Sequence, residues 1–201
     1  MLTKTQQEII ALLLDKPEEN FTIRRTARDL HKSYTLVYNN IEDLRKRDLI
    51  VKEKVPPATI ISLNEFCPNE ILIEIENLRK NRFIKSQPWI NVMLKDILSN
   101  TDKVFFTLLV FGSYAKGSQT KTSDIDLLII VPTKDDIEFL ENAIRNSYSK
   151  AKKSVVIVSR DDFINMIKNP QQLNVGNEAK KHHILLYGLE NFYALLEKAK
   201  K

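Results

Sequence analysis

The chain has 201 residues and a formal net charge of +5 at pH 7, with 43% hydrophobic and 28% charged residues. This balance is typical of globular proteins and excludes a largely disordered chain, and 4 Gly and 7 Pro are too few for a collagen-like one. The single cysteine, Cys67, excludes an internal disulfide framework and a multi-cysteine zinc site. Without a signal peptide or an apolar run of about 20 residues, we expect a cytoplasmic protein with no membrane partner.

The first part of the chain predicts short helices in close succession. Residues 5–14 carry apolar side chains at helical spacing, and Thr22 is an N-cap candidate for a second helix. Ser33 is an N-cap candidate for a third helix over residues 34–47. The apolar positions of this third helix recur at steps of three and four and share one face: Leu36, Val37, Ile41 and Leu44.

Two short strands, 49–54 and 58–63, are expected next, and Pro56 and Pro57 mark the turn between them because proline cannot continue a central strand. The order of helix, helix–turn–helix and hairpin resembles the winged helix–turn–helix domains of bacterial and archaeal transcription regulators. Residues 33–50 resemble their recognition helix and its exit into the wing, with Asp48 where a glycine is usual. We therefore expect a winged helix–turn–helix domain over residues 1–65.

This resemblance implies double-stranded DNA as a partner, and residues 24–47 contain seven Lys/Arg against three acids, an excess that suits phosphate contacts. The exposed start of the third helix is where base edges would be read. The predicted nucleic-acid-binding residues are Arg24, Arg25, Ser33, Tyr34, Thr35, Tyr38, Asn39 and Lys52. The same charges could form a solvated helix face, and winged helices also bind proteins. A homodimer is plausible because helix–turn–helix proteins commonly read paired half-sites.

Residues 66–100 predict a helical linker, with helices over 69–86 and after Pro88. Residues 101–201 alternate between strand-like and helix-like segments. Strands are expected over 104–111, 124–131 and 154–159, and helices over 134–148, 159–168 and 189–200. We therefore predict an α/β (α+β) chain whose second domain is a mixed sheet with flanking helices.

The chemistry is concentrated in the segment 110–130. A buried strand is expected to end at Gly112 and Ser113, a polar loop follows, and the next strand begins with Asp124 and Asp126. Side chains two apart on a strand share a face, so the two carboxylates lie side by side and repel each other. A divalent cation would relieve this repulsion, and Mg²⁺ prefers one or two carboxylates together with substrate phosphates. The Gly112-Ser113 turn offers close backbone approach and a hydroxyl donor to a phosphate.

A Walker A phosphate loop is the competing interpretation, because Gly112 and Gly117 have its Gly-x-x-x-x-Gly spacing. However, Ser118 and Gln119 stand where Lys and Ser/Thr are required. The loop is also followed by a strand rather than a helix. We therefore reject this alternative.

The segment instead resembles the signature of the nucleotidyltransferase superfamily related to DNA polymerase beta: Gly-Ser, a loop of about ten residues, then Asp-x-Asp in an apolar strand. Lys116-Gly117 and Ser123 resemble its minimal nucleotidyltransferase branch. The resemblance implies that Asp124 and Asp126 are catalytic and hold Mg²⁺ or Mn²⁺, and that Gly112, Ser113 and Ser123 bind a nucleoside triphosphate (NTP). The implied reaction transfers a nucleoside monophosphate to an acceptor hydroxyl and releases pyrophosphate, which a two-metal site suits.

One position departs from the superfamily pattern. A third carboxylate usually lies on the next core strand, where this sequence has Ser154. Either another residue substitutes for it or the site is weakened. The alternative function is therefore a winged-helix DNA-binding transcription regulator whose second domain binds nucleotide without turnover. A third hypothesis follows from minimal nucleotidyltransferases that act beside a small all-helical partner protein in toxin–antitoxin pairs.

Overall fold

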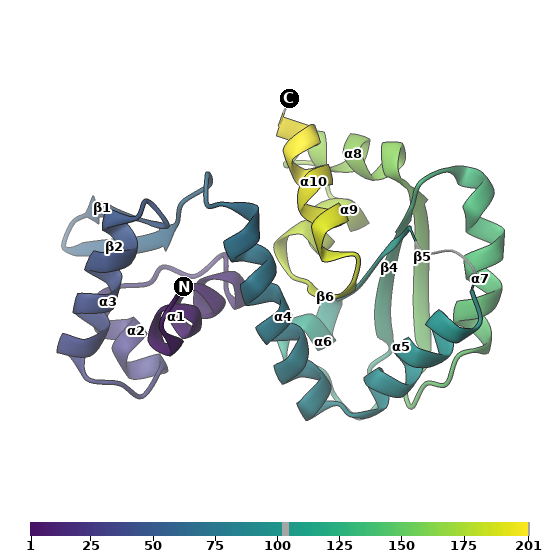
Figure 1. The fold of residues 1–201 in the computed structure, drawn as a ribbon, viewed down its shortest axis with the longest axis horizontal. Helices are drawn as coiled ribbons and strands as arrows, with labels where there is room; N and C mark the ends of the chain where they lie inside the picture. The colour runs from purple at the N-terminus through teal and green to yellow at the C-terminus, as the bar shows by residue number, and fades with distance from the viewer. Residues whose placement is uncertain (102–104, 201) are drawn as a thin grey trace. The chain divides into compact units, whose positions relative to one another are not determined.

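The computed structural model describes residues 1–101 and 105–200, and these residues form two compact units, Met1–Ile75 and Glu76–Lys201 (Figure 1). The border between them lies within α4 (Asn69–Ser86). The predicted domain borders at residues 65 and 100 remain predictions about which segments fold alone. Among the described residues, no helix is long and apolar enough to cross a membrane.

The first unit is a winged-helix-like arrangement of helices and a hairpin. Its elements are α1 (Lys4–Asp15), α2 (Ile23–Asp29), α3 (Tyr34–Lys46), β1 (Ile50–Val55), β2 (Ala58–Leu63) and the start of α4. Thr22 and Ser33 cap α2 and α3 as predicted. Their hydroxyl oxygens accept hydrogen bonds from the backbone amides of Arg25 and Leu36, respectively. Val37, Ile41 and Leu44 of the predicted apolar face of α3 are fully buried. Leu36, expected on the same face, is 44% exposed, because it lies about 100° around the helix from Val37.

The hairpin follows the predicted turn. β1 and β2 pair antiparallel from Ile50 opposite Leu63 to Val55 opposite Ala58, with Pro56 and Pro57 between them. Asp48, just before β1, has φ 56°, a left-handed conformation that favours glycine. This conformation explains why the resemblance places a glycine here.

The second unit contains, among the described residues, a four-stranded mixed sheet of order β5-β4-β3-β6. β3 (Thr107–Phe111) pairs antiparallel with β4 (Ile125–Val131) and with β6 (Ile184–Tyr187), whereas β4 pairs parallel with β5 (Lys153–Ser159). β3 is buried at every position, and β4 at every position except Asp126. Such continuous burial arises when helices cover both faces of a sheet.

The helices of the second unit divide between the two sheet faces. α5 (Trp89–Ser99) and α7 (Ile137–Asn146) pack in one core with alternate residues of β3 and β4, such as Leu108 and Ile129. α8 (Arg160–Lys168), α9 (Val175–Lys181) and α10 (Leu189–Lys200) contact the sheet as well. The rings of Phe163 and Phe192 join α8 to α10 with centroids 5.9 Å apart.

Several elements differ from the sequence-based expectation. α6 (Gly112–Lys116) replaces the first part of the expected loop, and α9 and β6 were not expected. The helix expected over 134–148 is a 3₁₀ turn, η1 (Lys134–Asp136), followed by the shorter α7. α7 ends early because the Lys153 ammonium donates hydrogen bonds to the carbonyls of its last turn. Val104, expected to start a strand, lies outside the described residues.

A buried ionic cluster lies inside the second unit. Arg79 Nη1 donates to Glu76 Oε1 over 2.6 Å, and Tyr193 Oη donates to the same oxygen over 3.1 Å. His183 Nε2 lies 3.4 Å from it, and Arg79 Nη2 donates to the His183 carbonyl. Burial by itself would raise the pKa of Glu76, but Arg79, His183 and Tyr193 together lower it to about 2. The cluster therefore links α4 to β6 and α10 through one ionised carboxylate.

Replacing this carboxylate tests the cluster. Glu76→Gln should lower the free energy of unfolding at neutral pH by about 3–5 kcal/mol, because it leaves the Arg79 guanidinium buried without a counter-charge. Urea unfolding followed by circular dichroism measures this loss. Glu190→Gln, on the exposed first turn of α10, is the control and should stay within about 0.5 kcal/mol.

The difference in unfolding free energy between the wild type and Glu76→Gln should depend on pH. The folded-state pKa of Glu76 lies below its ordinary value of 4.5, so its contribution is complete above that pH and is lost as the pH falls toward 2. The stability difference between the wild type and Glu76→Gln should therefore shrink on acidification. A constant difference down to pH 2 would contradict the ionised carboxylate.

Candidate functional site

The predicted signature lies where β3 leaves the sheet and β4 enters it. Phe111, the last residue of β3, is opposite Asp126 in the antiparallel register. Gly112 follows with φ 65°, and a Cβ on it would lie 2.2 Å from Asp126 Oδ2. Only glycine therefore fits at residue 112 without displacing the carboxylate. The backbone and the carboxylate approach each other closely at this edge of the sheet.

The loop after Gly112 is closed by its own hydrogen bonds. The amide of Ser118 donates to the carbonyl of Ser113 over 3.0 Å, and Gly117 ends α6 in a left-handed conformation. Ser123 Oγ accepts the amide of Thr120 over 2.9 Å. Ser123 therefore shapes the loop, whereas the Ser113 hydroxyl makes no hydrogen bond to any other described residue and is half-buried beside the turn.

The structure brings Asp124 and Asp126 to the same end of β4. They flank the fully buried Ile125, and because side chains two apart on a strand share a face, their carboxylates point to the same side. Asp124 is 41% exposed, and its Oδ2 lies 3.6 Å from the Lys152 ammonium. Asp126 is less exposed and faces three other polar side chains.

Asp126 is partly buried and lies near two other acidic side chains, Asp124 and Glu178. Burial raises the pKa of Asp126 above its ordinary value, and the charges of Glu178 and Asp124 raise it further, while a hydrogen bond from Ser154 lowers it. Ser154 is its register neighbour on β5. Glu178 comes from α9, and its Oε1 lies 3.1 Å from the Lys116 ammonium. The sequence analysis did not single out Glu178, because it lies on a helix that the sequence pattern does not predict.

These residues fit a divalent cation that also binds substrate phosphates. The carboxylates of Asp124 and Asp126 supply hard oxygen ligands, the kind that suits Mg²⁺ or Mn²⁺. The described residues contain no group of three or more His, Cys, Asp or Glu side chains arranged to hold a metal by themselves. Burial raises the pKa of Asp126 and the charges of Glu178 and Asp124 raise it further, whereas a bound cation would favour its ionised form. The donor set therefore fits a cation shared between protein and ligand rather than one enclosed by protein.

The predicted nucleic-acid-binding residues gather on the first unit, around the start of α3. Tyr34, Thr35, Tyr38 and Asn39 are all exposed. The rings of Tyr34 and Tyr38 stack with centroids 6.1 Å apart, and the Lys52 ammonium lies 5.3 Å from the centre of the Tyr38 ring. α3 and β1 thus present aromatic and polar side chains on one surface, next to a cation.

The predicted basic residues differ in whether an acidic side chain pairs with them. Arg24 is exposed and has no acidic partner among the described residues. Arg25 pairs with Glu19 and Asp29 and lies over the Phe21 ring, and Lys52 pairs with Glu42. Within residues 1–75, Arg24 is therefore better placed for phosphate contacts than Arg25 or Lys52. The Ser33 hydroxyl caps α3.

Comparison with known families identifies part of the chain. Residues 93–185, slightly under half of its length, match the family described as "Nucleotidyltransferase domain". This stretch contains the whole signature from Gly112 to Asp126 and lies within the second unit. The second unit therefore contains a stretch that matches the nucleotidyltransferase domain family. No curated protein matches the chain at a significant level.

The chain also resembles solved structures of regulators. They are a point mutant of Lactococcus lactis ZitR, the adhesin competence repressor AdcR of Streptococcus pyogenes, and MepR, a transcription regulator of the Staphylococcus aureus efflux pump MepA. Identities are 20%, 24% and 15%, with TM-scores of 0.37, 0.37 and 0.35. The matches cover 47%, 45% and 49% of this chain and 62%, 66% and 78% of those chains. The chain thus spans less than two thirds of the length of the first two of these proteins.

Two glycine replacements test the close approach at the signature. Gly112→Ala and Gly117→Ala both place a side chain at positive φ, which costs about 1–2 kcal/mol. Only Gly112→Ala also pushes against Asp126, which adds about 1–3 kcal/mol, because a Cβ on Gly117 meets nothing within 4 Å. Urea unfolding should therefore show the larger loss for Gly112→Ala. Equal losses in the two variants would contradict the contact.

Proposed function

We propose that the second unit is a metal-dependent nucleotidyltransferase, which transfers a nucleoside monophosphate from an NTP to an acceptor hydroxyl and releases pyrophosphate. The observation that carries this proposal is the approach of Gly112 to Asp126, with Asp124 on the same side of β4. A glycine turn beside two carboxylates is the arrangement that a triphosphate and its cation require. It lies inside the stretch that matches the nucleotidyltransferase family.

Each residue of the site has a role in this proposal. Asp124 and Asp126 hold Mg²⁺ or Mn²⁺, and Gly112 and Ser113 bind the triphosphate through the backbone and the free hydroxyl. Ser123 holds the loop that covers the nucleotide, through its hydrogen bond with Thr120. When bound, the metal stabilises negative charge on the phosphate oxygens. The protein positions the triphosphate against the acceptor and removes water from the buried side of the site.

The acceptor hydroxyl must lose a proton, and β5 supplies no carboxylate for this step. Ser154 stands opposite Asp126, and a serine hydroxyl is a poor base at neutral pH. Glu178 is the carboxylate that approaches from another element, but its charge is partly neutralised by Lys116. Proton removal is therefore the step in which this site departs most from the superfamily pattern.

The first unit, in our proposal, binds double-stranded DNA through α3 and the hairpin. The exposed Tyr34 and Tyr38 pair and the polar side chains of Thr35 and Asn39 lie where a recognition helix contacts base edges. The unpaired guanidinium of Arg24 supplies a phosphate contact beside them. The unit would thus deliver the transferase to nucleic acid or control its expression.

A second candidate function rests on Ser154. If no other group removes the proton, the second unit binds a metal–nucleotide complex without turning it over, and the chain acts as a nucleotide-sensing DNA-binding regulator. The position of Ser154 opposite Asp126 on β5 favours this candidate, because a serine stands there in place of the usual carboxylate. Sustained pyrophosphate release that depends on Asp124 and Asp126 would exclude it.

The carboxylates can be tested by nucleotide binding. Asp124→Asn and Asp126→Asn should each abolish Mg²⁺-dependent binding of ATP, GTP or CTP, because each removes a charged metal ligand. Isothermal titration calorimetry with and without Mg²⁺ or Mn²⁺ measures this effect. Asp135→Asn, an exposed acid on η1, is the matched control and should bind as the wild type does. Unchanged binding in both site variants would overturn the proposal.

The DNA-binding face can be tested by salt dependence. Arg24→Ala should weaken binding to duplex DNA and lower the slope of log affinity against log salt by about one, because one phosphate contact is lost. Fluorescence anisotropy over a range of salt concentrations gives this slope. Lys85→Ala removes an equal charge from α4 in the second unit and should leave the slope unchanged. The same slope in all three proteins would place the DNA elsewhere.

A further inference from the structure

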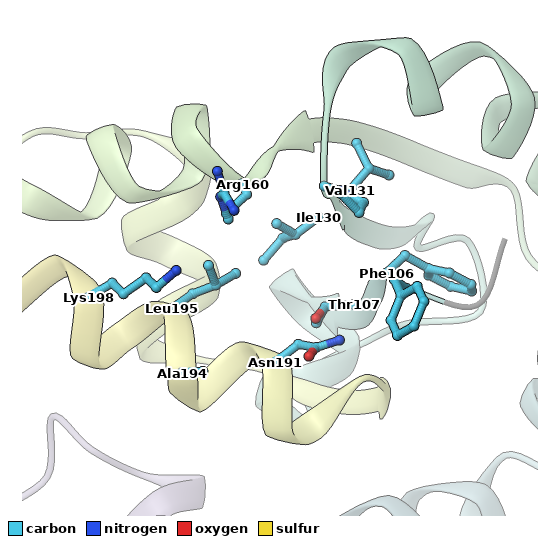
Figure 2. A pocket seen from close by; sticks show the side chains of 11 residues that line it. Phe106, Thr107, Ile130, Val131, Arg160, Asn191, Ala194, Leu195 and Lys198 are labelled. Carbon is cyan, nitrogen blue, oxygen red and sulfur yellow. The ribbon is translucent and has the colours of Figure 1, made fainter.

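A pocket of about 230 Å³ lies in the second unit, apart from the signature (Figure 2). Its floor is apolar and comes from the start of β3 and the end of β4, where Phe106, Ile130 and Val131 are almost fully buried. Its other walls are the first residue of α8, Arg160, and one face of α10, which contributes Ala194 and Lys198 among others. The pocket is therefore built from four elements that are far apart in the sequence.

Two cations stand at one end of the pocket, whereas at the other end Phe106 lies beside the polar side chains of Thr107 and Asn191. Figure 2 shows Arg160 and Lys198 on one side, Phe106 on the opposite side and Ile130 between them. The Nε of Arg160 donates a hydrogen bond to Asp161 Oδ1 over 3.0 Å. The two terminal nitrogens of its guanidinium are left for a further contact. Lys198 is exposed and has no acidic partner among the described residues. The two cations thus leave a local positive charge beside an apolar surface.

This pocket is separate from the carboxylates, although both lie on one face of the sheet. In the antiparallel register Thr107 is opposite Ile130, and Phe111 is opposite Asp126. The pocket residues and the carboxylates are therefore four residues apart along β4, or about 13 Å. Side chains an even number of residues apart on a strand share a face, which places Asp126 and Ile130 on the same side. An NTP held at Gly112 and Asp126 leaves this pocket free.

We propose that the pocket binds a small organic anion whose apolar body is about the size of a benzene ring and which carries one carboxylate or phosphate group. A dry cavity of about 150 Å³ accepts a benzene ring, so the larger volume here leaves room for the anionic group as well. The apolar body packs on Ile130 and Phe106, and the anionic group contacts Lys198 and Arg160. Two neighbouring cations on a partly covered surface favour an anion over a neutral ligand.

The probes are benzoate, phenyl phosphate and the neutral benzamide, added to the full chain and followed by amide and methyl chemical shifts. Benzoate or phenyl phosphate should bind with a dissociation constant near 1 mM, as expected for a ligand of this size, and at least about tenfold tighter than benzamide. The tighter anion identifies the preferred group, carboxylate or phosphate. Equal binding of all three probes, or binding of none, would overturn the proposal.

Two variants locate the binding. Ala194→Leu fills the pocket from an exposed helix position, and Lys198→Gln removes a cation while keeping most of the side chain. Each should weaken the preferred anion about tenfold, whereas Lys85→Gln, the charge-matched control on α4, should not. Unchanged binding of the anion in both Ala194→Leu and Lys198→Gln would overturn the proposal, because the anion would then lie outside this pocket.

Discussion

Asp126 can occupy its place at the end of β3 only because residue 112 has no side chain. A Cβ there would come within 2.2 Å of the carboxylate, and the positive φ of Gly112 also turns the chain from β3 into α6. The short α6 and the hydrogen-bonded loop then return the chain to the sheet at Ile125. The position of Asp126 and the turn beside it therefore depend on this one contact.

The second constraint is the balance of charge around that contact. Asp126 lies within the influence of Asp124 and Glu178, and burial strengthens the repulsion because it removes the carboxylates from water. Lys116 and Lys152 offset part of this charge, each through a pair with an acid other than Asp126. Among the described residues, Ser154 is the neighbour that lowers the pKa of Asp126. The site is therefore best balanced when a cation is shared with a polyanionic ligand, which agrees with a transferase of nucleotides.

Inside the second unit, the buried charge of Glu76 is balanced by neighbouring protein side chains. Glu76 is fully buried, and Arg79, His183 and Tyr193 surround one of its oxygens, so the carboxylate stays ionised without solvent. Because α4, β6 and α10 meet there, the cluster fixes the helix that joins the two units to the sheet that carries the aspartates.

The sequence alone determined the features that are local in the chain. Periodicity and capping residues predicted α1, α3, α4, α8 and α10 within a few residues, and Gly-Ser followed by Asp-x-Asp predicted the chemistry of the signature. Only the tertiary structure decided which distant groups surround it. The charge of Glu178 acts on Asp126 from a short helix without a clear sequence pattern, and the pairing of Lys52 with Glu42 depends on the packing of β1 against α3. Contacts between residues far apart in sequence leave no periodic signal, because they are set by how the sheet and helices assemble.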